Sequence, residues 1–145
     1  MVISDLESSD KNAALQEISS HLCANGHSIP GSAELIFQAL LHREGLGSTG
    51  IGGGVAIPHA RIPGLAQLTG IFARSVDGIA FNSIDKAPVQ LIFALLVPEN
   101  SGGSHLKALA RIARLFKNGD FRDVLIDITG ADELYETFIA EDTKT

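Results

Sequence analysis

The chain has 145 residues, of which 45% are hydrophobic and 19% charged, and its formal net charge at pH 7 is −6. This length and composition fit one domain with a single sizeable core and argue against a disordered chain. The acidic balance argues against a nucleic-acid-binding protein, because such proteins neutralise phosphates with clustered Lys and Arg. Cys23 is the single cysteine, so no intrachain disulfide is possible, which suits a reducing compartment.

Targeting and membrane segments are not evident in the sequence. The N-terminus lacks a basic stretch followed by an apolar one, so no secretory signal peptide is predicted. The longest apolar run, residues 91–97, stops at Pro98 and is too short to cross a bilayer. We therefore expect a cytoplasmic protein with no direct membrane insertion.

The N-terminal region is predicted to be helical after a polar start. Residues 4–10 are mostly polar and are expected to be loosely held. Leu15, Ile18 and Leu22 then recur at the spacing of one helix face, in a run that ends at Gly26. A second predicted helix reaches about residue 44, and Ser32 is positioned to be its N-cap.

The composition of the sequence changes after the second predicted helix. Residues 45–54 are rich in glycine, and residues 55–57 form a short strand-like run. Pro58 favours extended geometry in the residue before it and offers no N–H to a sheet. This part of the chain therefore predicts a loop followed by a short strand.

The central region predicts three strands. Residues 69–74 read as one strand, and residues 79–82 read as a short second strand after the turn signal Asp77-Gly78. Residues 89–97 are continuously apolar, which is typical of a strand that is covered on both faces.

The C-terminal region predicts helices again. Ser104 is positioned to cap a helix that runs to Phe116, and a short helix is expected at residues 121–126. Thr129 and Asp132 resemble a capping box for a last helix. Helices on both sides of centrally concentrated strands predict an α/β fold, in which a mixed β-sheet is flanked by helices on both faces. We expect a single domain over residues 1–145, with an ordered core at about residues 6–141.

The sequence gives little support to a dinucleotide-binding site or to a metal site. Residues 45–50 have the letters of a dinucleotide-binding fingerprint, but a helix precedes them and a strand follows, which reverses the required order. A metal shared by His59 and His105 lacks a visible third ligand, and no His-Glu-x-x-His motif is present. The sequence therefore predicts neither a metal nor a cofactor.

His59 is the strongest candidate for chemistry. It follows Pro58 at the end of a predicted strand, beyond glycines whose backbone N–H groups can approach an anion without a Cβ in the way. Neutral imidazole is a nucleophile near pH 7 and can form covalent intermediates. The competing interpretation is a structural histidine that ends a strand and bonds a backbone carbonyl. Local physics alone favours that competing interpretation.

His105 is the second candidate. It would lie in the first turn of a helix, where the partial positive charge favours neutral imidazole and attracts anions. A neutral His105 would donate one hydrogen bond to a phosphoryl oxygen. The alternative is an exposed residue of a first helical turn.

Three segments carry a resemblance to a known family. Residues 48–60 (STGIGGGVAIPHA), 87–98 (APVQLIFALLVP) and 105–109 (HLKAL) resemble the mannitol/fructose-type enzyme IIA family of the bacterial phosphotransferase system. The likeness extends from about Leu6 to the last helix. The stand-alone domain and the segment that ends in Ala60-Arg61 look most like the nitrogen-regulatory branch.

The resemblance implies a phosphotransferase component with a transient phosphohistidine. His59 would accept the phosphoryl group on Nε2 from an HPr-type phosphocarrier protein, His105 would be the second active-site histidine, and Arg43 would lie near the phosphate. No metal is required, because the donor is already a phosphoprotein. Three residues of the glycine-rich segment are further candidates for binding the phosphate: Ser48, Thr49 and Gly54.

The downstream acceptor stays open at this point. One interpretation is a nitrogen-regulatory protein whose partners distinguish phosphorylated from free His59. The alternative is a sugar-specific enzyme IIA that passes phosphate to a separate enzyme IIB of a fructose/mannitol-type permease. A third interpretation, a metal-dependent hydrolase built on His59 and His105, predicts that phosphate acceptance needs a metal.

Overall fold

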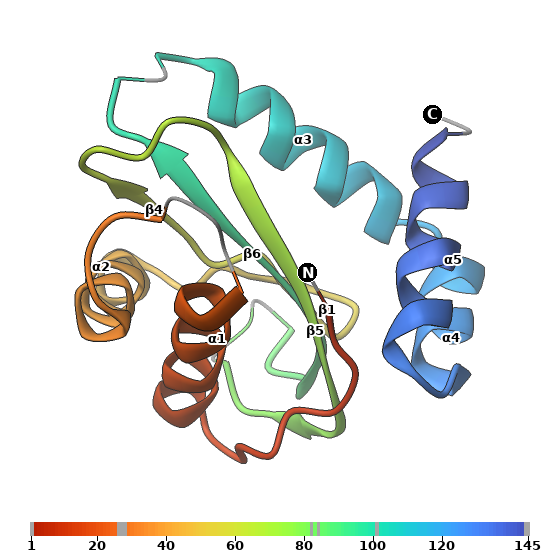
Figure 1. The fold of residues 1–145 in the computed structure, drawn as a ribbon. Coiled ribbons are helices and arrows are strands. Elements are labelled where there is room, and N and C mark those ends of the chain that lie inside the picture. The colour runs from red at the N-terminus through yellow and green to blue at the C-terminus, as the bar shows by residue number, and fades with distance from the viewer. Residues whose placement is uncertain (1, 26–28, 82, 84, 101, 144–145) are drawn as a thin grey trace.

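The computed structural model describes residues 2–25, 29–81, 83, 85–100 and 102–143. Most strands lie in the middle of the chain and helices lie toward both ends, as the sequence predicts (Figure 1). The elements are β1 (Val2–Ile3), α1 (Lys11–Asn25), α2 (Ala33–Leu46), β2 (Gly50–Gly52), β3 (Val55–Ala56), β4 (His59–Ile62), β5 (Thr69–Ile79), β6 (Val89–Pro98), α3 (Ser104–Phe116), α4 (Gly119–Asp127) and α5 (Ala131–Thr143).

The six strands form one mixed sheet with β6 at its centre. The strand order is β1-β5-β6-β3-β2, and β4 also pairs with β6. β5 is antiparallel to β6, whereas β3 and β4 are parallel to it and follow one another along its other edge. β6 is therefore an interior strand, and helices that pack on both faces of the sheet explain its continuously apolar sequence.

Pro58 separates β3 from β4 without ending their path along β6. Proline has no N–H to give to the sheet, but its carbonyl accepts a hydrogen bond from the Leu95 backbone at 2.9 Å. The preceding residue, Ile57, donates its N–H outward to the carbonyl of Thr49 at 3.0 Å. This interruption places His59 at the first position of β4, rather than at the end of the preceding strand.

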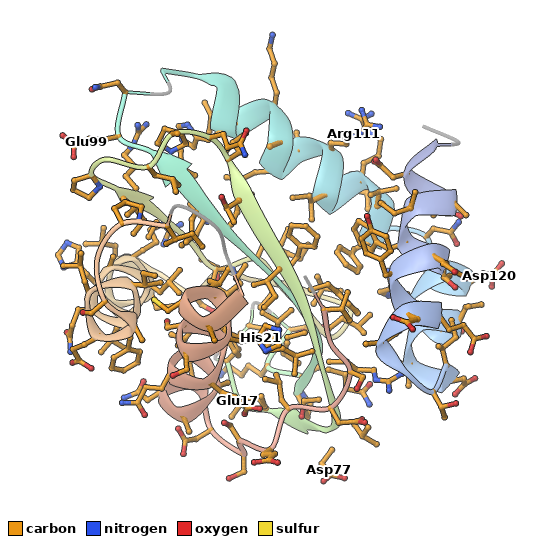
Figure 2. The ribbon with its side chains drawn as sticks, viewed as in Figure 1. Glu17, His21, Asp77, Glu99, Arg111 and Asp120 are labelled. Atoms are coloured by element: carbon orange, nitrogen blue, oxygen red, sulfur yellow. The ribbon has the colours of Figure 1, made fainter. Side chains whose placement is uncertain are left out.

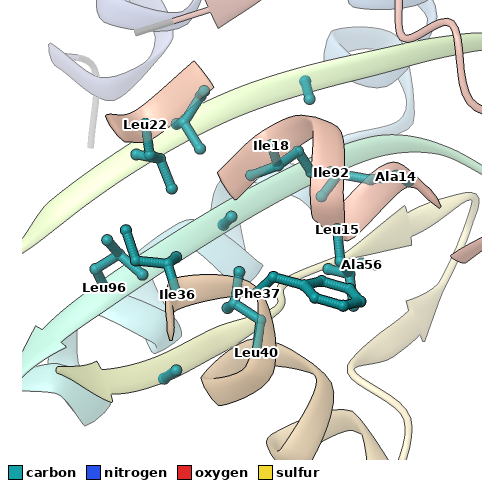
Figure 3. Close-up of a cluster of buried hydrophobic side chains, with 14 of the residues drawn as sticks. Ala14, Leu15, Ile18, Leu22, Ile36, Phe37, Leu40, Ala56, Ile92 and Leu96 are labelled. Atoms are coloured by element: carbon teal, nitrogen blue, oxygen red, sulfur yellow. The ribbon is translucent and has the colours of Figure 1, made fainter. Parts of the chain in front are cut away.

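Helices cover both faces of the sheet, which confirms the predicted fold class. α1 and α2 pack on one face, and α3, α4 and α5 pack on the other. Neighbouring residues of β6 serve opposite faces, because side chains alternate along a strand: Ile92 packs with α1 and α2, and Leu91 packs with the C-terminal helices. Figure 3 shows the first of these clusters, in which Leu15 and Leu22 of α1 face the sheet. Each such buried side chain contributes about 1.5 to 3 kcal/mol to stability.

The predicted helices are present. Ser32 caps α2, where its hydroxyl accepts the N–H of Leu35 at 3.2 Å. α1 begins at Lys11 and carries the expected apolar face, while the predicted stop, Gly26, lies outside the described residues. α3 begins at Ser104, with Gly103 rather than Ser104 in the N-cap position. No helix within the described ranges is long and apolar enough to cross a membrane.

The prediction of two strands separated by a turn at Asp77-Gly78 is wrong. β5 continues through this dipeptide as one strand, and its pairing with β6 changes register between Arg74 and Ile79. Gly78 has a φ of +83°, and it forms part of a β-bulge in β5 and not of a hairpin turn. The remainder of the predicted second strand includes Asn82, which lies outside the described residues.

The polar N-terminal segment is tied down, contrary to the expectation. Val2 and Ile3 form a strand parallel to β5. The backbone N–H of Ser8 donates to the carboxylate of Glu17 at 3.1 Å, and its hydroxyl donates to the same carboxylate at 2.6 Å. Figure 2 shows Glu17 on α1. Polar side chains of this segment and of α1 therefore make hydrogen bonds that hold the turn before α1.

Candidate functional site

A hollow of about 400 Å³ lies where the last turns of α2, the strand β4 and the start of α3 come together. It brings together three residues that the sequence singled out, His59, His105 and Arg43. Its full lining is Ala39, His42, Arg43, Leu46, His59, Ala60, Arg61, Val97 and His105. Two arginines and three histidines thus surround the hollow in a protein of net negative charge.

His59 presents one ring nitrogen for chemistry. Its Nδ1 lies 3.0 Å from the carbonyl oxygen of Ile57, so Nδ1 carries the proton and donates it to this oxygen. In neutral imidazole the lone pair then lies on Nε2, and no described residue hydrogen-bonds that atom. The side chain is half-buried, so it is neither sealed in the core nor fully solvated.

Burial and the positive charge of Arg43 favour the neutral form of His59. Desolvation is the largest cause that lowers its pKa below the ordinary 6.5, and Arg43 and His105 lower the pKa further. The hydrogen bond to Ile57 and the carboxylate of Glu44 act in the opposite direction without reversing the shift. A lowered pKa leaves Nε2 unprotonated at neutral pH, as a nucleophile requires.

His105 is the second residue of α3 and is also fixed through Nδ1. That nitrogen lies 3.1 Å from the carbonyl oxygen of Gly102, so the only N–H of a neutral ring is already engaged. Nε2 of neutral His105 is consequently an acceptor. The expectation that a neutral His105 donates to a phosphoryl oxygen therefore needs correction, because donation from Nε2 requires the doubly protonated ring.

Arg43 lies in the last turn of α2 and reaches across the end of that helix. Its Nη1 donates to the carbonyl oxygen of Gly47 at 2.8 Å, which anchors the guanidinium beside the hollow. One bond uses one of the five donors of an arginine, so the others remain for an anion.

Sequence reasoning missed Arg61 and His42 as lining residues. Arg61 is two residues beyond His59 on β4, and its Nη1 donates to the carbonyl of Glu99 at 2.9 Å. Alternation along a strand places residues i and i+2 on one side, and this signal was available once β4 was known to continue past His59.

The hydroxyl candidates Ser48 and Thr49 do not line the hollow. Ser48 donates its hydroxyl to the carbonyl of Phe81 at 2.5 Å and accepts the N–H of Gly50 at 3.1 Å. Thr49 is buried, and its hydroxyl bonds the carboxylate of Glu44. Both hydroxyl groups hold the loop between α2 and β2.

The glycines of the signature also lie away from the hollow. Gly52, Gly53 and Gly54 have φ values of +92°, +65° and +78°, and together they make the tight turn between β2 and β3. The carbonyl of Gly54 accepts the N–H groups of Gln90 and Leu91. The glycine-rich segment therefore shapes a hairpin, in contrast to the expected glycine lining around His59.

Among the described residues, no group of three or more His, Cys, Asp or Glu side chains is arranged to hold a metal ion. His59 and His105 thus share the hollow with arginines instead of acidic ligands.

The family model for the phosphoenolpyruvate-dependent sugar phosphotransferase system, EIIA 2, matches residues 1–141. The chain belongs to this family. As a member of the EIIA 2 family it is a phosphotransfer component of that system. This finding confirms the family that the signature residues predict.

Individual relatives agree with the family match. The chain is 44% identical to a nitrogen regulatory protein of Bradyrhizobium diazoefficiens over 135 residues, which covers 92% of this chain and 86% of the relative. It is 39% identical over 129 residues to the nitrogen regulatory protein of Escherichia coli, covering 88% and 77%. The fold matches the crystal structure of nitrogen regulatory protein IIA-Ntr from Neisseria meningitidis with a TM-score of 0.86 and 39% identity, over 94% of this chain and 91% of that one.

Proposed function

We propose that this chain is a phosphocarrier that accepts a phosphoryl group on Nε2 of His59 from an HPr-type protein and acts mainly as a nitrogen-regulatory enzyme IIA. The observation that carries the proposal is the hydrogen bond from Nδ1 of His59 to the carbonyl of Ile57. This bond leaves the lone pair on Nε2 of a half-buried ring in the hollow.

The transfer step joins two imidazoles. Nε2 of His59 donates its lone pair to phosphorus while the bond between phosphorus and the nitrogen of the carrier's phosphohistidine breaks. The electron pair of the broken bond stays on the carrier's imidazole, which becomes neutral or takes a proton. Such transfers depend mainly on alignment and on stabilising the charge of the equatorial oxygens.

The cationic lining supplies that charge stabilisation. Arg43 offers N–H donors that suit phosphoryl oxygens, and the His105 ring lies in the same hollow. The N-terminus of α3 adds a partial positive charge beside the same hollow. Arg61 supplies a further cation at the rim.

Similarity to relatives favours the regulatory role. The relatives of highest identity and coverage reported above carry the name nitrogen regulatory protein. The alternative, phosphate transfer to a sugar-permease enzyme IIB, is supported by 42% identity over 90 residues to a fructose-specific EIIA component of Haloferax volcanii. A pull-down with phosphorylated and unphosphorylated protein separates the two roles. Release of regulatory proteins without onward transfer supports the first, and transfer to an enzyme IIB supports the second.

The central test is phosphorylation of a His59→Ala variant. With phosphoenolpyruvate, the upstream enzyme and an HPr-type carrier, we expect the wild type to be labelled and the variant to remain unlabelled, because the accepting atom is missing. His21→Ala, on α1 (Figure 2), is the matched histidine control and should be labelled like the wild type. Persistent labelling of His59→Ala, measured by phosphate incorporation, would reject the assignment.

A further inference from the structure

A buried carboxylate lies next to the proposed site without lining the hollow. Glu44 follows Arg43 in α2, and its side chain is 2% exposed. An ion pair with Lys11 of α1, at 3.1 Å between Nζ and Oε2, compensates its charge. Burying an ionised carboxylate is costly unless all its oxygens are paired, so this placement calls for an explanation.

The second set of partners of Glu44 leads toward His59. The carboxylate accepts the backbone N–H of Thr49 at 3.1 Å and also bonds the hydroxyl of Thr49. The carbonyl of Thr49 accepts the N–H of Ile57 at 3.0 Å. The carbonyl of Ile57 in turn accepts Nδ1–H of His59 at 3.0 Å. Three consecutive links therefore join the buried carboxylate to the nucleophile.

This path crosses the point where the sheet is interrupted. Ile57 is adjacent to Pro58, and its N–H is bonded to Thr49 rather than to β6. The N–H and the carbonyl of Ile57 belong to adjacent peptide units that meet at its Cα. The bond from this N–H to Thr49 is therefore one of the contacts that orient the carbonyl, together with burial of the Ile57 side chain and the bond from Leu95 to the Pro58 carbonyl. The carbonyl of Ile57 selects the tautomer of His59, because it receives the Nδ1 proton.

We propose that Glu44 is a positioning residue for phosphoryl transfer, which helps to fix the ring orientation and tautomer of His59 through Thr49 and the backbone of Ile57. The inference rests on the proposed function, because it concerns the same nucleophile. Glu44 does not touch the phosphoryl group in this scheme. Its role is to keep the lone pair on Nε2 and to keep that atom aligned for in-line attack, to which transfer rates are very sensitive.

A purely structural role for Glu44 makes a different prediction. If the ion pair with Lys11 only joins α1 to α2, loss of the carboxylate lowers stability and leaves a correctly folded site intact. The two roles are separated by comparing variants of equal melting temperature. Leu22→Val, in the core of α1, is a control that lowers stability without touching the path to His59.

The first measurement is the rate of transfer from a phosphorylated HPr-type carrier. In Glu44→Gln an amide replaces the carboxylate and cannot satisfy the same three donors. We expect kcat to fall about tenfold or more with KM for the carrier unchanged. Thr49→Val removes the hydroxyl bond to Glu44 but keeps the two backbone bonds, so it should lower kcat in the same direction, whereas Thr49→Ser keeps the hydroxyl and should transfer at the wild-type rate. Leu22→Val should transfer at the wild-type rate.

The second measurement observes the ring directly. Nitrogen NMR of His59 should show the proton on Nδ1 in the wild type and in Leu22→Val. In Glu44→Gln a larger share of the ring should carry the proton on Nε2, the atom that must attack. This readout does not need the carrier, and it remains informative if Glu44→Gln is too unstable for kinetics, because Thr49→Val serves in its place.

The outcomes distinguish this inference from the proposed function. Failure to label His59 in the wild type would reject the function itself. A labelled wild type, together with folded Glu44→Gln that keeps the wild-type kcat and tautomer, would overturn the role of Glu44 alone. An equal loss of kcat in Leu22→Val at the same melting temperature would also overturn it, because stability would then explain the effect.

Discussion

The neutral state of His59 is set by burial and by the charges beside it, and this has a consequence for pH dependence. Protonated imidazole has no lone pair on Nε2, so under the proposed function transfer stops when His59 is protonated. Because the pKa of His59 is lowered, the ring stays neutral to a more acidic pH than an ordinary histidine. We expect kcat/KM to fall only below pH 6.5. Above that pH His59 stays neutral, so its titration should not affect kcat/KM.

Arg43 provides the test of this electrostatic account. After desolvation, its positive charge helps to lower the pKa of His59. In Arg43→Gln the pKa should rise toward 6.5, so the acid side of the pH–rate profile should move to higher pH. The maximal rate should also fall, because a donor to the phosphoryl group is lost. A profile of unchanged position, measured by rapid quench from pH 5 to pH 8, would contradict this account.

At the scale of elements, the β2–β3 turn explains the glycines of the signature. Gly54 has a φ of +78°, which a residue with a Cβ adopts at a cost of about 1 to 2 kcal/mol. The added Cβ would meet no atom closer than 3.7 Å, so backbone conformation is the main cost. We expect Gly54→Ala to lower the free energy of unfolding by about this amount and to leave kcat of the folded protein unchanged.

Gly45 offers the matched control for this change. It lies in α2, and a Cβ there would meet no atom within 4 Å. Gly45→Ala should raise the free energy of unfolding by up to about 1 kcal/mol, because alanine favours a helix. Urea denaturation measures both changes. A large loss of transfer rate in folded Gly54→Ala would instead support a direct role for this glycine in binding phosphate.

The sequence predicted the helices and strands whose signal lies in neighbouring residues. It missed the short strands that form only because they pair with segments far away in the chain. Apolar spacing and the Ser32 cap were sufficient for α1 and α2, and the apolar run was sufficient for β6. β1 and β4 are two and four residues long, and they exist because β5 and β6 hold them. The dipeptide Asp77-Gly78 has the composition of a turn, but pairing with β6 on both sides keeps it inside β5.

The site shows the same division between local and long-range information. The family resemblance pointed to His59, His105 and Arg43, which the structure brings to one hollow. Glu44 carried no signal, because its partners Lys11 and Thr49 lie 33 residues before it and five after it. Arg74 is a parallel case: this buried side chain on β5 donates to carbonyls at the end of α4, more than 50 residues away. No local pattern reveals such partners.

On the scale of the whole molecule, charge is distributed unevenly. Residues 119–143 contain one basic side chain, Arg122, and Figure 2 labels one of their acidic residues, Asp120, on α4. The acidic side chains of this region are Asp120, Asp123, Asp127, Asp132, Glu133, Glu136, Glu141 and Asp142. The net negative charge of the chain thus lies in α4 and α5, while the hollow is lined by arginine and histidine. A phosphorylated donor is therefore attracted to one part of the surface and repelled by another.

Exposed leucines beside the hollow offer an apolar contact for the donor of the proposed function. Leu46, which lines the hollow at the end of α2, is 74% exposed, and Leu106, the neighbour of His105, is 61% exposed. Large apolar side chains next to a cationic hollow fit a protein partner that presents a phosphohistidine within an apolar surface.

We expect Leu46→Asp to raise KM for the HPr-type carrier about tenfold, because the change removes apolar contact and adds a negative charge facing a phosphorylated donor. kcat at saturating carrier should change little, since Leu46 contributes no donor to the phosphoryl group. Val124→Asp, on α4, is the matched control, because Val124 is 47% exposed but does not line the hollow. Steady-state transfer kinetics measure both variants. If Val124→Asp raised KM as much as Leu46→Asp does, the carrier would have to dock over the C-terminal helices and not at the hollow.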